Sequence, residues 1–187
     1  MTRTSSFLSL LSESATIAMS RKSRELSKQG FDIINLSLGE PDFDTPDFIK
    51  KAAEKGIEEN YTHYMAVNGY EDVREAISAK FKRDNGLIYS KEQIVVSTGA
   101  KQTLANLFLS LVNPGDEVLL IAPYWVTYSE QVKMVKGIPK VIQTDIDTGY
   151  KISPEQLEKA ISPKTRLFVF NSPSNPSGAI YTKEEII

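Results

Sequence analysis

The feature that most restricts the fold is a regular alternation of short apolar segments with helical patterns, which begins near residue 92. The apolar segments are 93–97, 118–122, 140–144 and 166–170. Helical patterns follow at 101–112 and 124–136, and Ser153 caps a shorter one that has Pro154 at its first position. Strands that alternate with helices of this length predict parallel βαβ units, and near-continuous apolar strands predict a sheet covered on both faces. The expected fold class is α/β with a mostly parallel sheet.

The first ninety residues follow a different pattern. A charged amphipathic segment at 14–29 predicts a helix that Gly30 ends, and the strand-like "DIINLSL" follows at 32–38. A second helix is predicted from 45 to 60, and a third has apolar residues four positions apart and ends at Gly86. We expect an N-terminal arm and a helical layer that lead into the sheet.

Composition excludes several classes of function. With 41% hydrophobic residues, 25% charged residues and a formal net charge of −2, the chain has no charge pattern that favours nucleic acid or an anionic membrane. It has no cysteine, and its single histidine, His63, has no second histidine to share a metal. No apolar run approaches the roughly 20 residues that span a bilayer. The Ser-rich start has no small-residue cleavage site after its short apolar piece. We therefore expect a cytoplasmic protein without metal, membrane or nucleic-acid partners.

The segment "NSPSNPSG" directly follows the last apolar strand. Pro173 and Pro176 lack an N–H group and push Ser172 and Asn175 away from helical conformations. The segment therefore predicts a rigid loop that holds polar groups at the carboxyl end of a strand. In open α/β sheets, ligands bind at that end.

A second candidate site is "STGAKQ" at 97–102, where a predicted strand turns through a glycine into a helix. The first N–H groups of a helix and the positive end of its dipole suit a phosphate. A purely structural tight turn stays open as the alternative. The glycine patterns of dinucleotide-binding and nucleoside-triphosphate-binding loops are absent from the sequence.

Two further segments carry residues suited to a ligand. Trp125, the only tryptophan, directly follows the strand at 118–122, where its flat face suits an aromatic ligand. Gly39 interrupts the segment "LSLGEPDF", where a glycine lets the backbone approach a ligand closely or turns the chain. Taken alone, each residue is equally compatible with a structural role.

Together the four segments are more specific than any one of them. In their order and spacing, "LSLGEPDFDTP", "STGAKQTL", "DEVLLIAPYWVTY" and "NSPSNPSGAIYTKEE" resemble the class I, fold-type I aminotransferases that use pyridoxal phosphate. The likeness is greatest to the bacterial aspartate aminotransferases and extends from about Ser14 to Ile187.

The resemblance implies pyridoxal 5′-phosphate as cofactor and names the residues that hold it. Gly99, Ala100 and Lys101 match the turn that binds the cofactor phosphate, with Ala100 and Lys101 acting through main-chain donors. Trp125 matches the residue that stacks on the pyridine ring. Asn175 matches the residue whose amide donates to the phenolic O3′ of the cofactor.

It also implies a substrate site and a dimer. Gly39 matches the residue whose backbone N–H meets the substrate α-carboxylate, and Trp125 and Asn175 border the same space. Tyr64 matches a tyrosine that reaches the cofactor phosphate of the neighbouring subunit. The implied assembly is a homodimer with shared active sites.

No residue of this chain matches the catalytic lysine that forms the Schiff base in the family. That lysine and the groups that hold the ring nitrogen, O3′ and the α-carboxylate follow later in the family's chains, and Lys101 matches the phosphate end. Thr182 and Glu185 form a capping box for a helix that has barely begun at Ile187. We expect an N-terminal fragment, with an arm and the start of small-domain elements at 1–45, and the first half of the large cofactor-binding domain at 46–187. Alone, it is expected to have no turnover.

Several functional alternatives follow from the same residues. The first is transfer of an amino group from aspartate to 2-oxoglutarate by the full-length protein. Prephenate is less expected, because Ser12 and Glu13 stand where some bacterial relatives have a basic residue before "SAT". The others are a naturally short, non-catalytic dimerisation or binding module, and a different pyridoxal-phosphate enzyme of the same fold, either an aromatic aminotransferase or a lyase.

Overall fold

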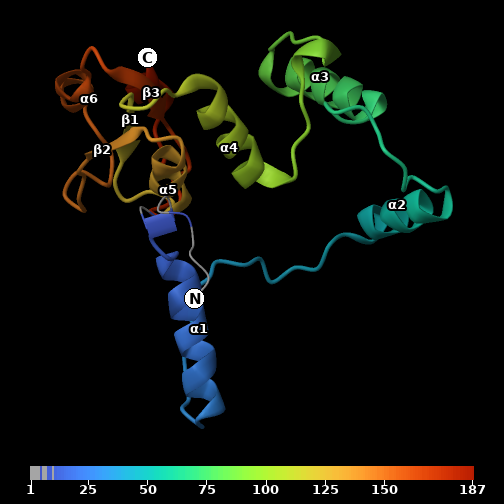
Figure 1. Ribbon diagram of the computed structural model, residues 1–187, viewed down its shortest axis with the longest axis horizontal. Coiled ribbons are helices and arrows are strands. Elements are labelled where there is room, and N and C mark those ends of the chain that lie inside the picture. The colour runs from blue at the N-terminus through green and yellow to red at the C-terminus, as the bar shows by residue number, and fades with distance from the viewer. Residues whose placement is uncertain (1–4, 6–7, 10) are drawn as a thin grey trace. The chain divides into compact units, whose positions relative to one another are not determined.

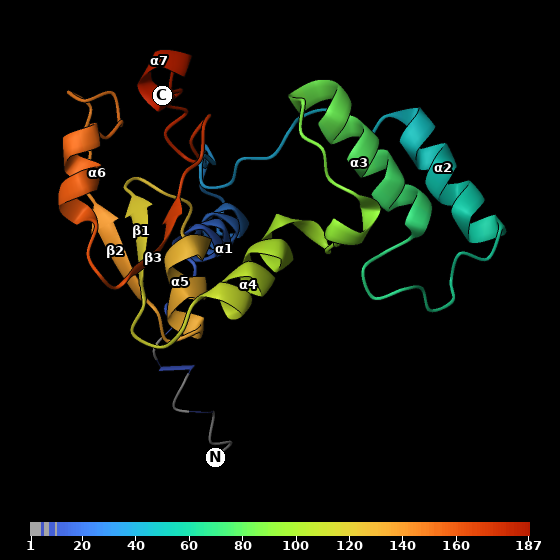
Figure 2. The same cartoon turned by 90° about the horizontal axis from the view of Figure 1, so that it is seen from above.

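Three short parallel strands form a sheet with the order β2-β1-β3. They are β1 (Glu117–Ile121), β2 (Ile138–Ile142) and β3 (Thr165–Val169), and Figures 1 and 2 show them side by side. The computed structural model describes residue 5, residues 8–9 and residues 11–187. It divides into a first unit, Met1–Ile33 with Lys101–Ile187, and a second unit, Ile34–Ala100.

Helices connect the strands of the first unit. The helix α5 (Thr127–Met134) lies between β1 and β2 in the chain, and α6 (Pro154–Ala160) lies between β2 and β3. Both strand pairs are parallel, with Leu119 of β1 opposite Lys140 of β2 and Phe168 of β3. The predicted βαβ units are therefore confirmed. The predicted cap of α6 is also present, because Ser153 Oγ accepts a hydrogen bond from the Gln156 N–H at 3.3 Å.

The core of the first unit lies between the sheet and two helices. Phe108 of α4 (Gly99–Leu111) and Val132 of α5 are fully buried against Val118 and Leu120 of β1. Each such side chain contributes roughly 1.5–3 kcal/mol through the hydrophobic effect. Leu119 points to the opposite face of the sheet and is also fully buried. Cover on both faces is thus complete at the central strand.

The edge of the sheet at β3 is less covered. Phe168 is 36% exposed, and Phe170, which follows the strand, is 43% exposed. Their rings lie 6.1 Å apart, and the Phe170 ring also packs against Tyr181 at 4.9 Å. A groove of about 330 Å³ on this side is bordered by both phenylalanines and by Leu157 of α6.

The helix α1 (Ala15–Lys28) belongs to the first unit and confirms the predicted helix at 14–29. Figure 1 shows it extending away from the sheet. The segment before it is attached to α5, because the Ser12 N–H donates to the Glu130 carboxylate at 2.8 Å. Glu13 forms an ion pair with Arg21 at 2.6 Å.

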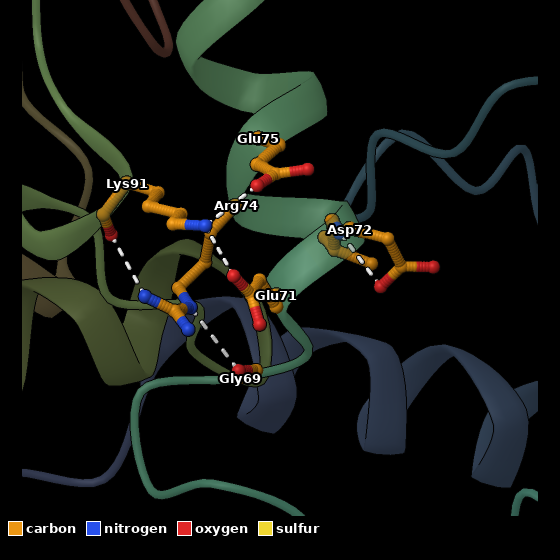
Figure 3. A network of polar contacts seen from close by, with 7 residues as sticks. Gly69, Glu71, Asp72, Arg74, Glu75 and Lys91 are labelled. Carbon is orange, nitrogen blue, oxygen red and sulfur yellow. Dashed lines mark hydrogen bonds and ion pairs between the residues drawn. The ribbon is translucent and has the colours of Figure 1, made fainter.

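The second unit contains α2 (Asp47–Glu58), α3 (Glu71–Asn85) and the short helix η2 (Lys91–Gln93), and polar contacts join α3 to η2. Arg74 of α3 is only 9% exposed and donates to the carbonyls of Gly69 at 3.2 Å and Lys91 at 2.9 Å. The Lys91 ammonium in turn contacts Glu71 and Glu75 (Figure 3). Both long helices and the left-handed Gly86 after α3 were predicted from the sequence.

Two predicted strands are wrong. Residues 93–97 form the end of η2 and an extended segment, in which the Val96 N–H donates to the Asn68 carbonyl at 3.1 Å. A strand needs a hydrogen-bonded partner strand, and none pairs with this segment among the described residues. Residues 32–38 are also irregular. There the Asn35 side chain accepts hydrogen bonds from the Ser37 N–H and hydroxyl, and this local turn competes with strand pairing.

The last helix, α7 (Lys183–Ile186), begins with the predicted capping box. Thr182 Oγ1 accepts from the Glu185 N–H at 3.3 Å, and the Glu185 carboxylate accepts from the Thr182 N–H at 2.7 Å. Within the described part of the chain, no helix has the length and apolar character needed to cross a membrane.

Candidate functional site

The carboxyl ends of β1 and β3 border a small cavity of about 20 Å³. That volume is comparable to the space that one water molecule requires. The polar side chains that line the cavity come from the segments that follow the strands and are Tyr124, Tyr128, Tyr150, Asn171, Ser174, Asn175 and Tyr181. Ligands of parallel α/β sheets bind at this edge, so the cavity marks the candidate site of the first unit.

The loop that carries Asn175 is closed by its own hydrogen bonds. The Asn175 N–H donates to the Asn171 side chain at 2.9 Å, and the Gly178 N–H donates to the Ser174 carbonyl at 2.8 Å. The Ser174 N–H donates to the Ala179 carbonyl at 2.9 Å. As the two prolines predict, the loop is not helical. It holds the exposed Asn175 at the border of the cavity, where an amide can donate to an oxygen of a ligand.

A second set of contacts fixes the loop from outside. The Tyr181 N–H donates to Ser172 Oγ at 3.1 Å, and the Tyr181 hydroxyl accepts from the Ile152 N–H at 2.8 Å. The Lys151 ammonium lies 5.6 Å from the centroid of the Tyr181 ring and pairs with Glu185 at 2.8 Å. These contacts join the end of the loop to the segment before α6.

Trp125 lies between two other side chains of the site. The Lys101 ammonium is 5.2 Å from the centroid of its ring, a cation–π arrangement. The Tyr128 ring meets it edge to face at 5.6 Å, and the Tyr128 N–H donates to the Trp125 carbonyl at 2.9 Å. Burial raises the pKa of the Tyr128 phenol, so this ring is neutral at physiological pH. Tyr128 also lines the cavity that Asn175 borders, whereas Trp125 is not among the lining residues.

Gln131 was not predicted from the sequence. Its amide nitrogen donates to the Lys101 carbonyl at 2.8 Å, and the residue is only 7% exposed. The available signal was its spacing, since Gln131 lies three positions after Tyr128 and therefore on the same side of α5. Tyr128, Asn171 and Tyr181 were not predicted either, because their partners are distant in the sequence or within a loop.

The other predicted site residues belong to the second unit. Gly39 is exposed and Tyr64 fully exposed. Gly99 begins α4 with a positive φ of 79°, and its N–H donates to the Ser97 carbonyl at 2.8 Å. The functional roles of all predicted site residues stay predictions: Gly39, Tyr64, Gly99, Ala100, Lys101, Trp125 and Asn175. Among residues 5, 8–9 and 11–187, no group of three acidic, histidine or cysteine side chains is placed to hold a metal ion.

Comparison with known proteins gives consistent results. Residues 32–187 match the family model described as aminotransferase class I and II. The chain is 50% identical over 179 residues to the aspartate/prephenate aminotransferase of Cereibacter sphaeroides, covering 96% of this chain and 45% of that protein. It is 46% identical over 176 residues to an aspartate aminotransferase from a Bacillus species, covering 94% of this chain and 45% of the relative.

A solved structure of the Thermus thermophilus aspartate aminotransferase with maleate aligns with a TM-score of 0.94 and 41% identity, covering 100% of this chain and 49% of that one. The parallel sheet is therefore that of the N-terminal part of a fold-type I aminotransferase. The chain spans about half the length of the curated relatives it matches. It belongs to the aminotransferase class I and II family.

Proposed function

We propose that this chain is the N-terminal half of a pyridoxal-phosphate-dependent transaminase that transfers the amino group of L-aspartate to 2-oxoglutarate. The observation that carries the proposal is the 50% identity over 179 residues to an aspartate/prephenate aminotransferase. It is supported by Trp125 and Asn175, which lie in the segments that follow β1 and β3. The closeness of the relatives favours a transaminase over a lyase of the same fold.

The side chains present fit the cofactor. Pyridoxal phosphate offers an aromatic ring, a phenolic oxygen and a phosphate dianion, and the first unit has a counterpart for each. The Trp125 indole offers an aromatic surface after β1, Asn175 supplies an amide at the border of the cavity, and Lys101 supplies a cation in the first turn of α4. An aromatic ring, an amide donor and a cation at a helix start are the groups that such a ligand requires.

Each residue then has a distinct task. When bound, the cofactor supplies an electron-withdrawing ring that accepts the electrons released as the α-proton leaves the amino acid. Trp125 stacks on the ring and keeps water from that face, whereas Asn175 donates to O3′ and thereby favours its ionised form. The main chain of Gly99, Ala100 and Lys101 binds the phosphate. The Gly39 N–H holds the α-carboxylate of the substrate.

The proposal extends to the assembly. We infer a homodimer in which Tyr64 of each subunit completes the phosphate site of the other, which agrees with a side chain that is fully exposed here. Residues 1–45 form an arm and the start of the small domain, and residues 46–187 form the first half of the large domain. The ligands are small molecules, and the compartment is the cytoplasm.

The first experiment is to sequence the coding DNA beyond the codon for Ile187 and to express the whole reading frame. We expect the frame to continue to a lysine that binds the cofactor. The purified product is expected to absorb in the near-ultraviolet and visible region with pyridoxal phosphate and to transaminate aspartate with 2-oxoglutarate. The chain of 187 residues alone is expected to be inactive.

A matched pair of variants tests the site. Asn175→Ala is expected to raise the pH at which the bound cofactor titrates, because O3′ loses the donor that favours its ionised form. Asn106→Ala, on the exposed side of α4, is expected to titrate as the wild type does. A stop codon directly after Ile187, or a full-length product that takes up no pyridoxal phosphate, contradicts the proposal and favours a non-catalytic binding module.

Prephenate is a second candidate acceptor, because several of the matched relatives are named aspartate/prephenate aminotransferases. Against it, Ser12 and Glu13 stand where some bacterial relatives have a basic residue before "SAT". The same assay with prephenate as acceptor decides between the two, and a higher kcat/KM for prephenate than for 2-oxoglutarate reverses the assignment.

A further inference from the structure

Four contacts in the first unit join Lys101, Trp125, Tyr128 and Gln131 in a ring of interactions. The Lys101 ammonium lies over the Trp125 ring, and Trp125 is held by the ring and the N–H of Tyr128. One turn later in α5, Gln131 returns to the main chain of Lys101 through a hydrogen bond of 2.8 Å. This ring of interactions therefore connects the first turn of α4 to the segment that carries the Trp125 indole.

Burial of the Gln131 amide costs folding free energy. The residue is 93% buried, and its Oε1 atom has no hydrogen-bond partner among the described residues. A buried polar atom without a partner destabilises the folded state, whereas an apolar side chain of the same size does not. The Lys101 carbonyl has two lone pairs, so it can accept the bond of its own helix without Gln131. Stability alone therefore does not explain an amide at this position.

The Gln131 amide instead fixes the distance between the first turn of α4 and α5. The Gln131 bond sets where the first turn of α4 lies relative to α5, and α5 determines where Trp125 lies through Tyr128. A rigid ligand with an anionic group at one end and an aromatic ring at the other needs both subsites at the correct distance. Displacement of one subsite by a fraction of an ångström lowers the affinity for such a ligand, because its two ends can no longer bind at the same time.

We propose that Gln131 is a positioning residue that holds the phosphate-binding start of α4 at the correct distance from the ring-stacking face of Trp125. This inference rests on the proposed function, because pyridoxal phosphate is the ligand that uses both subsites. A positioning role makes a prediction that a structural role does not. The affinity for a ligand that occupies only the start of α4 should not depend on Gln131.

The test compares Gln131→Met with the wild type in the full-length protein freed of cofactor. Methionine has the same length and no hydrogen-bonding amide. We expect the dissociation constant for pyridoxal phosphate to rise about tenfold, the change that the loss of one hydrogen bond of average net strength produces. The dissociation constant for inorganic phosphate is expected to stay unchanged, and the melting temperature to stay level or to rise. Gln143→Met, at an exposed position, is the control for loss of an amide and is expected to change none of the three.

Each outcome decides a different question. If the wild type binds no pyridoxal phosphate, the proposed function fails and this inference fails with it. If the wild type binds it and Gln131→Met binds it equally well, only the positioning role is overturned. Equal weakening of pyridoxal phosphate and inorganic phosphate also overturns it, because Gln131 then shapes the phosphate subsite alone. A second variant, Gln131→Leu, guards against poor packing of methionine, and failure of both variants to fold shows that the amide acts on stability instead.

Discussion

The two units of the chain use their apolar residues in opposite ways. In the first unit, Phe108, Leu119 and Val132 are fully buried between the sheet and its helices. In the second unit, Phe48 is 75% exposed and Val67 is fully exposed. Among its described residues, the buried positions are Ile94, Gly69 and the charged Arg74.

The difference shows that the units depend on different forces. The first unit buries enough apolar surface to be stabilised mainly by the hydrophobic effect. In the second unit, the hydrogen bonds of Arg74 and the ion pairs of Lys91 join α3 to η2, and large apolar side chains stay exposed. Its helices follow local sequence signals.

The largest expected effect is in the core of the first unit. Phe108→Ala removes a fully buried ring between α4 and β1 and is expected to lower the free energy of unfolding by about 3–5 kcal/mol. Urea denaturation monitored by circular dichroism measures the change. The matched variant in the second unit, Phe48→Ala, is expected to change it by less than about 0.5 kcal/mol. An equal loss for Phe48→Ala means that its ring is covered in solution.

A smaller effect is expected from the polar network of the second unit (Figure 3). Arg74→Met keeps much of the apolar stem but removes the donors to Gly69 and Lys91, so we expect a loss of roughly 1–3 kcal/mol. Hydrogen exchange should rise in peptides from residues 69–93 and stay unchanged in β1. Arg83→Met, at an exposed arginine paired with Asp84, is the control. Equal exchange in the two variants would show that the network does not hold the unit.

The same contrast explains what the sequence predicts. Helix ends have local causes, so Gly86 after α3, the N-cap at Ser153 and the capping box at Thr182 were predicted correctly. The three strands of the first unit were predicted because their apolar runs are buried against their own neighbours. The segments 32–38 and 93–97 have strand-like composition, but strand formation depends on a distant partner that composition does not reveal.

The site shows the same limit. Trp125 and Asn175 were predicted because they lie in the segments that follow strands, where ligands of parallel sheets bind, and their roles stay predictions. Gln131 and Tyr181 were not predicted, because their contacts are single hydrogen bonds to Lys101 and to Ile152. Such contacts exist only after the elements have packed.

The smallest expected effect compares carboxylates of the two units. In the first unit, the hydrogen bond from Ser162 at 2.6 Å and the ammonium of Lys140 at 3.1 Å hold the pKa of Glu117 below its usual range. In the second unit, contact with Lys91 lowers the pKa of Glu71. A carboxyl group with a lowered pKa in the folded state stabilises the protein above the pKa of the unfolded chain, and this contribution is lost as pH falls through the folded pKa.

The melting temperature of the wild type should therefore fall more steeply with acidification below about pH 5 than that of Glu117→Gln or Glu71→Gln. High salt should screen the contributions of Glu117 and Glu71 to different extents. The Glu117 side chain is 17% exposed and Glu71 is 65% exposed, so about 1 M NaCl should abolish the difference for Glu71 and leave most of it for Glu117. Calorimetry across pH at low and high salt measures this. Equal screening at the two sites would mean that Glu117, at the start of β1, is as accessible to ions as the surface pair. The contrast between a packed and an open unit would then not extend to electrostatics.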